Sequence, residues 1–265
     1  MLSLLLCLFF MVPYPLTHSR LQRVILDMRT VNDRVVWTEC GKRLDYIDAL
    51  KRSAEYAEMI QDAVDLVYVN HNRVINPYHV AILIDTESSF DKCSIGNREM
   101  KMLKKDLTKH DNVFYHNNVV WHLRMWRVVY SKALRACNKD RKCMDGYMKE
   151  RYPAYRRIGS WYLGLGQYKW PGPHFYRDMF SLPDGSVVRK LDLDNIFDDT
   201  TSIQMIVNDL VMYTDMCTEK HRHKYRSKLE RELGYIVHHN TGGAAWSRRY
   251  LRVLVKKMKR ARVVK

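Results

Sequence analysis

An unbroken apolar run from Val80 to Ile84 is the clearest feature of the hydrophobic pattern. Asn76 and Pro77 stand before it, and they suit a helix start because the Asn side chain can cap and Pro needs no N–H at the first position. The pattern therefore predicts a helix that is buried nearly all round. Residues three and four positions apart are neighbours on a helix surface. One face of this helix therefore carries Val80, Leu83, Ile84 and Glu87.

Glu87 is the first candidate for chemistry. Burial and the negative end of the helix dipole both disfavour the ionised form of a carboxylate at this position. A carboxyl group kept neutral near pH 7 is suited to general acid catalysis. From this helix alone, an ordinary solvated Glu at a fraying helix end is an equal alternative.

Other stretches show helical spacing. Residues 51–70 carry apolar side chains at that spacing, and so do residues 119–136, 194–216 and 246–258. The Asp and Asn residues of 194–216 are expected on its exposed face, and residues 225–237 form a further helix with many charge pairs. In the first of these helices the core-facing residues are Ala54, Ala57, Ile60, Ala63, Val64 and Val67. Residues 160–180 are rich in Gly, Pro and aromatic residues and are interpreted as a loop region.

Residues 91–158 separate the apolar helix from this loop region. Their aromatic and apolar residues recur at helical spacing, with Arg and Lys between them. We interpret the segment as an inserted helical hairpin, with a candidate disulfide between Cys137 and Cys143, which flank a short polar loop. The alternative is a wall of a glycan-binding cleft, but aromatic residues at helical spacing more often form a core.

Composition and charge narrow the possible partners. The chain has 265 residues, a net charge of +16 and a pI near 9.6, which fits one domain with extensions and a sizeable core. A surface this basic attracts nucleic acid, anionic lipid or an anionic polymer such as a bacterial wall. The basic run Lys256–Arg262 is expected to extend a solvated helix.

The N-terminus indicates export. Met1 to Val12 is almost wholly apolar, Pro13 breaks the run, and small residues follow at Thr17 and Ser19. A secretory signal over residues 1–19 is the favoured interpretation, and a short membrane anchor or a buried N-terminal helix is the alternative. Cys217, His221 and His223 match no common zinc spacing, so no metal and no cofactor is predicted.

Three short motifs, taken in order, give the chain a family resemblance. They are Ala57 to Phe90 with its Asn76-Pro77 turn and Glu87-Ser88 ending, Gly164-Leu-Gly-Gln167, and His239-Asn-Thr-Gly242 followed by Tyr250. Together they resemble the soluble lytic transglycosylases of the lysozyme-like superfamily, over about two thirds of the chain. The sequence departs from the family in the length of residues 91–158 and in having His239 where the family usually has Tyr.

The resemblance implies a fold and a set of site residues. The fold would be mainly α, of the α+β lysozyme-like kind, with a helical bundle around a buried central helix and a glycan-binding cleft. Glu87 would be the catalytic acid and base, and the substrate-binding residues would be Ser88, Tyr162, Gln167, Asn240 and Tyr250. The domain would cover residues 51–258 with the insertion near 91–158, after an N-terminal extension at 20–50 and before a basic tail at 259–265.

The expected reaction is cleavage of the β-1,4 bond of peptidoglycan. Most glycosidases use two carboxylates, but Asp85 turns to another face of the helix and the direction of Asp91 cannot be determined from the sequence. In the family one Glu acts as acid and then as base, and the product is a 1,6-anhydro sugar. A hydrolytic goose-type lysozyme, with Asp91 assisting a water, is the nearest alternative. A basic nucleic-acid-binding protein is the third hypothesis.

These interpretations give the protein a setting. We expect a secreted or periplasmic protein, or a phage-borne one, whose partner is the peptidoglycan strand and not nucleic acid. We expect a monomer, and association with a membrane through the N-terminus is an alternative.

Overall fold

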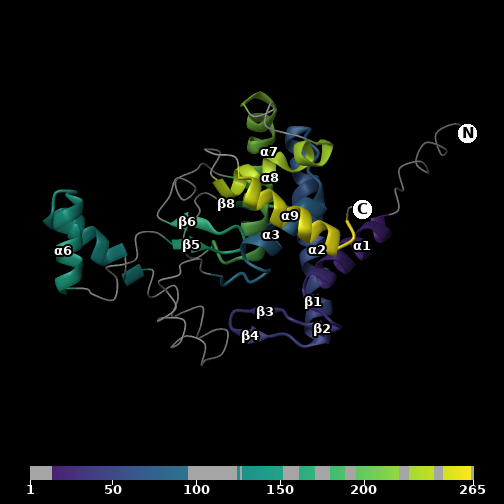
Figure 1. The fold of residues 1–265 in the computed structure, drawn as a ribbon, viewed down its shortest axis with the longest axis horizontal. Helices are drawn as coiled ribbons and strands as arrows, with labels where there is room; N and C mark the ends of the chain where they lie inside the picture. The colour runs from purple at the N-terminus through teal and green to yellow at the C-terminus, as the bar shows by residue number, and fades with distance from the viewer. Residues whose placement is uncertain are drawn as a thin grey trace, which may run out of the picture. The chain divides into compact units, whose positions relative to one another are not determined.

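The computed structural model describes residues 14–94, 124–125, 127–151, 161–170, 180–188, 195–220, 227–241 and 247–263 (Figure 1). This part of the chain is mostly helical, with only short two- and three-residue strands. The expectation of a mainly α protein is therefore confirmed. None of the helices in the described ranges is both long enough and apolar enough to cross a bilayer.

The chain divides into two compact units. The first contains Met1–Trp37, Leu44–Thr86 and Ile203–Lys265, and the second contains Thr38–Arg43 and Glu87–Ser202. These boundaries differ from the expected ones, because residues from the expected extension at 20–50 enter both units. The expected signal at 1–19 lies outside the described residues up to Pro13, and residues 14–19 already belong to the first helix.

The first unit begins with α1 (Tyr14–Met28), which packs along α2 (Tyr46–His71). α1 buries Leu21, Val24, Ile25 and Met28, whose spacing of three and four residues makes one apolar stripe. A two-stranded hairpin, β1 (Thr30–Val31) with β2 (Arg34–Val35), follows α1 directly. The region after residue 20, which had no assigned role in the sequence, thus supplies part of the core.

The helix expected at residues 51–70 is present as α2, which extends from Tyr46 to His71. Asp45 caps its first turn through an Asp48 N–H to Oδ1 bond of 2.8 Å, and Asn72 ends it in the left-handed conformation. Ala54 is exposed, contrary to expectation, while Ser53 and Tyr56 are buried. Tyr56 faces the core because it stacks on the fully buried Trp37, with ring centroids 5.9 Å apart.

The central helix α3 (Pro77–Glu87) begins as predicted. Asn76 Oδ1 accepts the Tyr78 N–H at 3.0 Å, and Pro77 occupies the first helical position. Every residue from His79 to Asp85 is buried. The helix is therefore surrounded by protein along most of its length, as its continuous apolar run indicated.

Three more helices follow late in the chain. They are α7 (Asp199–Lys220), α8 (Lys228–Thr241) and α9 (Arg248–Arg260). α7 buries the expected apolar residues except Val211, which is half-buried. The prediction that its acidic residues face outward is wrong, because Asp209 is fully buried. Thr201, Ser202 and Gln204 on the same helix are buried as well.

The second unit contains short hairpins. β3 (Thr38–Glu39) pairs with β4 (Lys42–Arg43), and β7 (Phe180–Ser181) pairs with β8 (Val187–Val188). β5 (Trp161–Leu163) pairs with β6 (Tyr168–Trp170) within the segment that was expected to be a loop. The glycines of that segment form the turn of a hairpin. Its strands have only three residues each, which is too short for an alternating apolar and polar pattern to be recognised in the sequence.

The predicted helical hairpin is present in the described part of the insertion. Residues 127–136 are helical, a turn follows, and α6 (Arg141–Arg151) returns (Figure 1). Val129, Ala133 and Met148 form its small core, and the predicted Cys137–Cys143 disulfide closes the turn. Residues 95–123 and 152–158 of the insertion lie outside the described residues, and so do His221, His223 and the side chain of Cys217.

Candidate functional site

Glu87 is the last residue of α3, at the expected end of the buried helix. Its side chain is half-buried, whereas the sequence pattern predicted a buried acid. The buried acid on this helix is Asp85, two residues earlier and 4% exposed. Asp85 was assigned to another face of the helix, but that face is covered as well. Glu87 therefore combines a partly shielded carboxylate with access to solvent.

The chain reverses sharply after Glu87. Ser88 is buried, and Ser89 and Phe90 both adopt left-handed conformations, with φ of 60° and 59°. Such conformations cost a non-glycine residue roughly 1–2 kcal/mol each. The Phe90 ring is fully buried, so packing of the ring offsets part of this cost. The turn fixes the direction in which the chain leaves Glu87.

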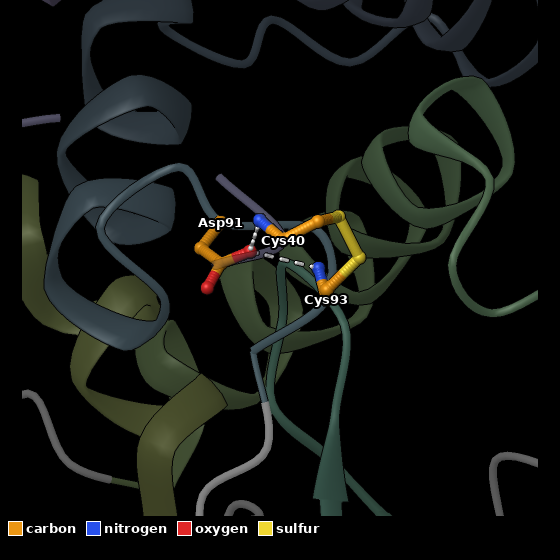
Figure 2. Close-up of side chains that lie close together, drawn as sticks. All are labelled: Cys40, Asp91 and Cys93. Atoms are coloured by element: carbon orange, nitrogen blue, oxygen red, sulfur yellow. Dashed lines mark hydrogen bonds between the residues drawn. A yellow bond between two sulfur atoms is a disulfide. The ribbon is translucent and has the colours of Figure 1, made fainter. Parts of the chain in front are cut away.

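The reversed segment is anchored by Asp91 and a disulfide (Figure 2). Cys93 is bonded to Cys40, and Asp91 Oδ1 accepts the backbone N–H of Cys40 at 2.9 Å and that of Cys93 at 3.0 Å. The three side chains have the residue types of a metal site and lie within 4.8 Å of one another. The two sulfurs are bonded to each other, however, so the group is a structural cross-link and not a set of metal ligands.

The Gly164–Gln167 turn is hydrogen-bonded to this same segment. Ser94 O accepts the Gly164 N–H at 3.2 Å and the Gln167 Nε2–H at 3.1 Å. Gln167 Nε2 also donates to Gly164 O at 2.9 Å, across a turn in which Gln167 has a φ of 50°. Two motifs that are far apart in the sequence are thus joined seven residues after Glu87. Because Gln167 Nε2 has two protein carbonyls as partners, a contact of Gln167 with substrate remains a prediction.

Gly164 is required at its position. Its φ is +69°, and a Cβ built there would lie 2.6 Å from the backbone oxygen of Ile196. Only glycine tolerates both the conformation and the approach. The turn is therefore held between Ser94, in the segment that follows α3, and the chain that leads into α7.

A charge pair lies close to the anchored segment. Lys92 Nζ and Asp199 Oδ2 are 3.4 Å apart, and Asp199 is the first residue of α7. An acidic residue in the first turn also suits the positive end of that helix. Lys92 thereby ties the segment after Glu87 to the start of α7 within the second unit.

The remaining predicted site residues fall in both units. Tyr162 lies on β5 opposite Lys169, one residue before the buried Leu163, and its side chain is 42% exposed. Tyr250 is half-buried in the first turn of α9, where its N–H donates to Ser247 Oγ at 3.2 Å. Asn240 lies in the last turn of α8, and its side chain is outside the described set. Glu87, Ser88, Tyr162 and Gln167 thus belong to the second unit, whereas Asn240 and Tyr250 belong to the first.

His239 occupies the position where the resembled family usually has Tyr. Its imidazole is buried in the first unit, with Nδ1 3.9 Å from Asp209 Oδ2 and an edge-to-face contact to the Tyr213 ring at 6.2 Å. An acidic and an aromatic side chain from α7 thus enclose it. His239 is a core residue in this arrangement.

Sequence reasoning missed the residues that hold the site together. Cys40, Ser94 and Ile196 support it through a disulfide, a backbone carbonyl and a close approach to Gly164. An unpaired remainder of cysteines was visible in the sequence, but it does not reveal which two pair. Backbone carbonyls carry no residue-type signal, so no pattern could have identified Ser94 or Ile196.

Comparison of the chain with protein-family models, with curated proteins and with solved structures found no match. The functional argument therefore rests on the side chains and contacts described above.

Proposed function

We propose that this protein is a peptidoglycan lytic transglycosylase with a lysozyme-like fold and a glycan-binding cleft. The observation that carries the proposal is the pair of hydrogen bonds from Gly164 and Gln167 to Ser94 O. They join the glycine turn to the segment that follows Glu87, which is the association of motifs that a lysozyme-like site requires.

Glu87 is the single acid and base in the proposed reaction. Its protonated carboxyl gives a proton to the oxygen of the β-1,4 bond, and that bond breaks toward the leaving sugar. The acetamido group of the muramic residue stabilises the cationic carbon. Glu87, now ionised, removes the proton of the C6 hydroxyl as that oxygen bonds to C1, which closes a 1,6-anhydro ring. The half-buried position of Glu87 supports this role, because the polymer needs access while the proton needs a shielded donor.

The surroundings of the neighbouring acids favour one carboxylate over two. Asp85 is buried, and its two carboxylate oxygens face Arg29 and Lys257 within the first unit. Asp91 Oδ1 is engaged by two backbone N–H groups. Both acids are thus held in structural contacts. These contacts weigh against the runner-up, a hydrolytic goose-type-like lysozyme in which Asp91 assists a water.

The proposed setting is the cell envelope, for a secreted, periplasmic or phage-borne enzyme. The Cys40–Cys93 and Cys137–Cys143 disulfides support an oxidising compartment. The same feature weighs against the third hypothesis, a nucleic-acid-binding protein, which the net charge of +16 otherwise suits.

The test is mass spectrometry of the fragments released from purified peptidoglycan. The protein should release fragments with anhydro ends, and Glu87→Gln should release none while keeping its fold and its binding to the wall. Glu58→Gln is the matched control, because Glu58 is an exposed carboxylate on α2. Reducing ends, which carry one more water, would favour the hydrolytic alternative. Full release by Glu87→Gln would refute the mechanism.

A further inference from the structure

The charged residues of α9 are all basic. The helix contains seven Lys and Arg residues and no Asp or Glu, and no acidic residue follows Glu232 in the chain. α2 and α8, by contrast, interleave acidic and basic residues. A helix without a single acid, in a chain with 29 Asp and Glu residues, requires an explanation beyond net charge.

Two of the seven cations serve the fold. Lys257 Nζ binds the Asp85 carboxylate at 2.5 Å, and Arg260 donates to Thr30 O at 2.7 Å. Leu251, Leu254 and Met258 are buried and form the apolar face of the helix. The basic run was expected to be solvated, and this is wrong for Lys257 and Met258. These residues hold α9 against the rest of the first unit by an ion pair and by packing.

The other five cations are exposed, and they define what we call the cationic face: Arg248, Arg249, Arg252, Lys256 and Lys259. At about 100° per residue these positions fall within roughly 100° of the helix circumference and extend over about 17 Å. Successive cations are spaced about 4.5–6 Å along the axis where they stand three or four residues apart. Among the described residues, no carboxylate forms an ion pair with any of the five.

Stability alone does not explain the cationic face. Arg248 and Arg249 stand in the first turn, where the helix dipole favours acids and disfavours cations. Arg248 with Arg252, and Arg252 with Lys256, are like-charge pairs four residues apart, which destabilise a helix. Within the described part of the chain no contact requires these five charges, so a binding role accounts best for them.

We propose that the cationic face binds a linear phosphate-bearing polymer of the cell wall, an inference that rests on the proposed function for its location. Three of the five cations are Arg, whose planar fork donates two hydrogen bonds to one phosphate. A polymer with one charge in each short repeat matches closely spaced cations, whereas a glycan strand carries charges at most once per disaccharide.

Two other polyanionic partners fit less well. A helix that lies on a membrane inserts its apolar face into the bilayer, but Leu251, Leu254 and Met258, which form that face of α9, are buried in the protein. Val253 is exposed, and one valine is too little apolar surface to insert. Single-stranded nucleic acid is bound with aromatic side chains on which bases stack, and the cationic face has none. Duplex nucleic acid could also place its phosphates on a row of cations, but the oxidising compartment of the proposed function, supported by the two disulfides, weighs against it.

The experiment measures binding of the full chain to purified bacterial walls that carry phosphate polymers, before and after cold hydrofluoric acid removes those polymers. Glu87→Gln is present in every protein so that the walls are not cut. One variant changes all five residues of the cationic face to Gln. Its matched control changes five exposed lysines elsewhere, Lys51, Lys132, Lys139, Lys142 and Lys149, to Gln, so both lose the same net charge.

We expect the cationic-face variant to bind untreated walls at least tenfold more weakly than the control, with a shallower salt dependence by about 0.7 in log–log slope for each lost phosphate contact. On acid-treated walls, the protein with an intact cationic face and the cationic-face variant should bind with equal affinity. Equal binding by the two five-site variants would overturn the proposal. So would a larger loss of affinity for phosphatidylglycerol vesicles or for duplex DNA than for the wall. This experiment measures binding and not cleavage. If the protein proves not to cleave peptidoglycan, the comparison of the two five-site variants therefore still tests whether the cationic face binds the phosphate polymer.

Discussion

Lys257 Nζ donates to both the carboxylate and the backbone carbonyl of Asp85, at 2.5 and 2.8 Å. Arg29 Nη1 binds the second carboxylate oxygen at 2.7 Å. Asp85 lies in the last turn of α3, whose carbonyls have no partner within the helix. One ammonium group thus caps the helix end and neutralises a buried acid, and it links the C-terminal helix to the centre of the first unit.

Replacing Asp85 by Asn should destabilise the first unit by about 3 kcal/mol. The amide keeps the shape but leaves two cations near a buried, uncharged group. The value lies at the low end for buried pairs because the Lys257 side chain is 27% exposed. Urea unfolding checks it. Glu55→Gln is the control, since the Glu55 side chain is 57% exposed and loss of its pairing with Arg52 should cost less than about 1 kcal/mol. Equal losses in the two variants would contradict a special role for Asp85.

Asp85 also shows where the hydrophobic pattern stops being informative. The pattern located α3, its cap and its burial, because apolar runs and Asn-Pro starts are local signals. It assigned Glu87 to the core and could not recognise Asp85 as buried, because the cations that accompany Asp85 come from residues 56 and 172 positions away. Asp209, fully buried close to His239, was missed for the same reason. Long-range charge pairing leaves no periodic trace in either partner.

Gly164→Ala should destabilise the second unit by several kcal/mol. The new Cβ would lie 2.6 Å from the Ile196 carbonyl oxygen, and the φ of +69° adds a penalty of roughly 1–2 kcal/mol for any L residue. The shift needed to relieve the clash would also disturb the hydrogen bonds from Gly164 and Gln167 to Ser94. Thermal unfolding measures the loss, and peptidoglycan cleavage at a temperature where the variant is folded measures the effect on the site.

Two other glycines distinguish the cost of the steric clash from the cost of the positive φ. Gly185 has a φ of +82° and open space around it, so Gly185→Ala should show the conformational penalty alone, roughly 1–2 kcal/mol. Gly146 lies in α6 with nothing near its Cβ position, so Gly146→Ala should stabilise by about 0.5–1 kcal/mol. A Gly164→Ala variant no worse than Gly185→Ala would show that Ile196 moves away at little cost.

The two disulfides should differ in their contribution to stability. Cys40–Cys93 closes a loop of 53 residues and Cys137–Cys143 a loop of 6. Loop-closure entropy then predicts a loss of about 4 kcal/mol for the double Ser variant of the first pair and about 2 kcal/mol for that of the second. Denaturant titration of both variants tests the order. Only the first should also lower cleavage of the wall, because it releases the segment after Glu87. A loss of cleavage in the second alone would reverse that assignment.

The candidate site was predictable in its named residues and not in its supports. Glu87 and the Gly164–Gln167 turn were found because glycines, amides and a helix-terminal acid are recognisable residue types. The structure adds a shared backbone acceptor, Ser94 O, and gives Gln167 Nε2 an internal role that the motif did not indicate. The Cys137–Cys143 pair was predictable because its short polar loop is local, whereas Cys40–Cys93 joins distant segments.

A buried histidine should make the protein sensitive to mild acid. His79 on α3 is buried, with Nδ1 2.5 Å from the hydroxyl of Tyr235 on α8. Burial lowers the pKa of His79 from 6.5 to about 4, and burial raises the pKa of Tyr235, so both groups are neutral at pH 7. Between pH 6.5 and about 4 the unfolded chain binds a proton at this position and the folded one does not.

The free energy of unfolding must therefore fall as the pH falls through that window, by roughly 3 kcal/mol in total from this group, because each unit of pKa difference is worth about 1.4 kcal/mol. Urea unfolding at pH 7 and at pH 4.5 measures the fall. His79→Gln cannot take up the proton, so its stability should be lower at pH 7 through lost packing but should decline less on acidification. His71→Gln, at the exposed end of α2, should keep the full decline. If His79→Gln declines as steeply as the unaltered protein, the acid sensitivity comes from the carboxylates, and the buried His79–Tyr235 contact does not control it.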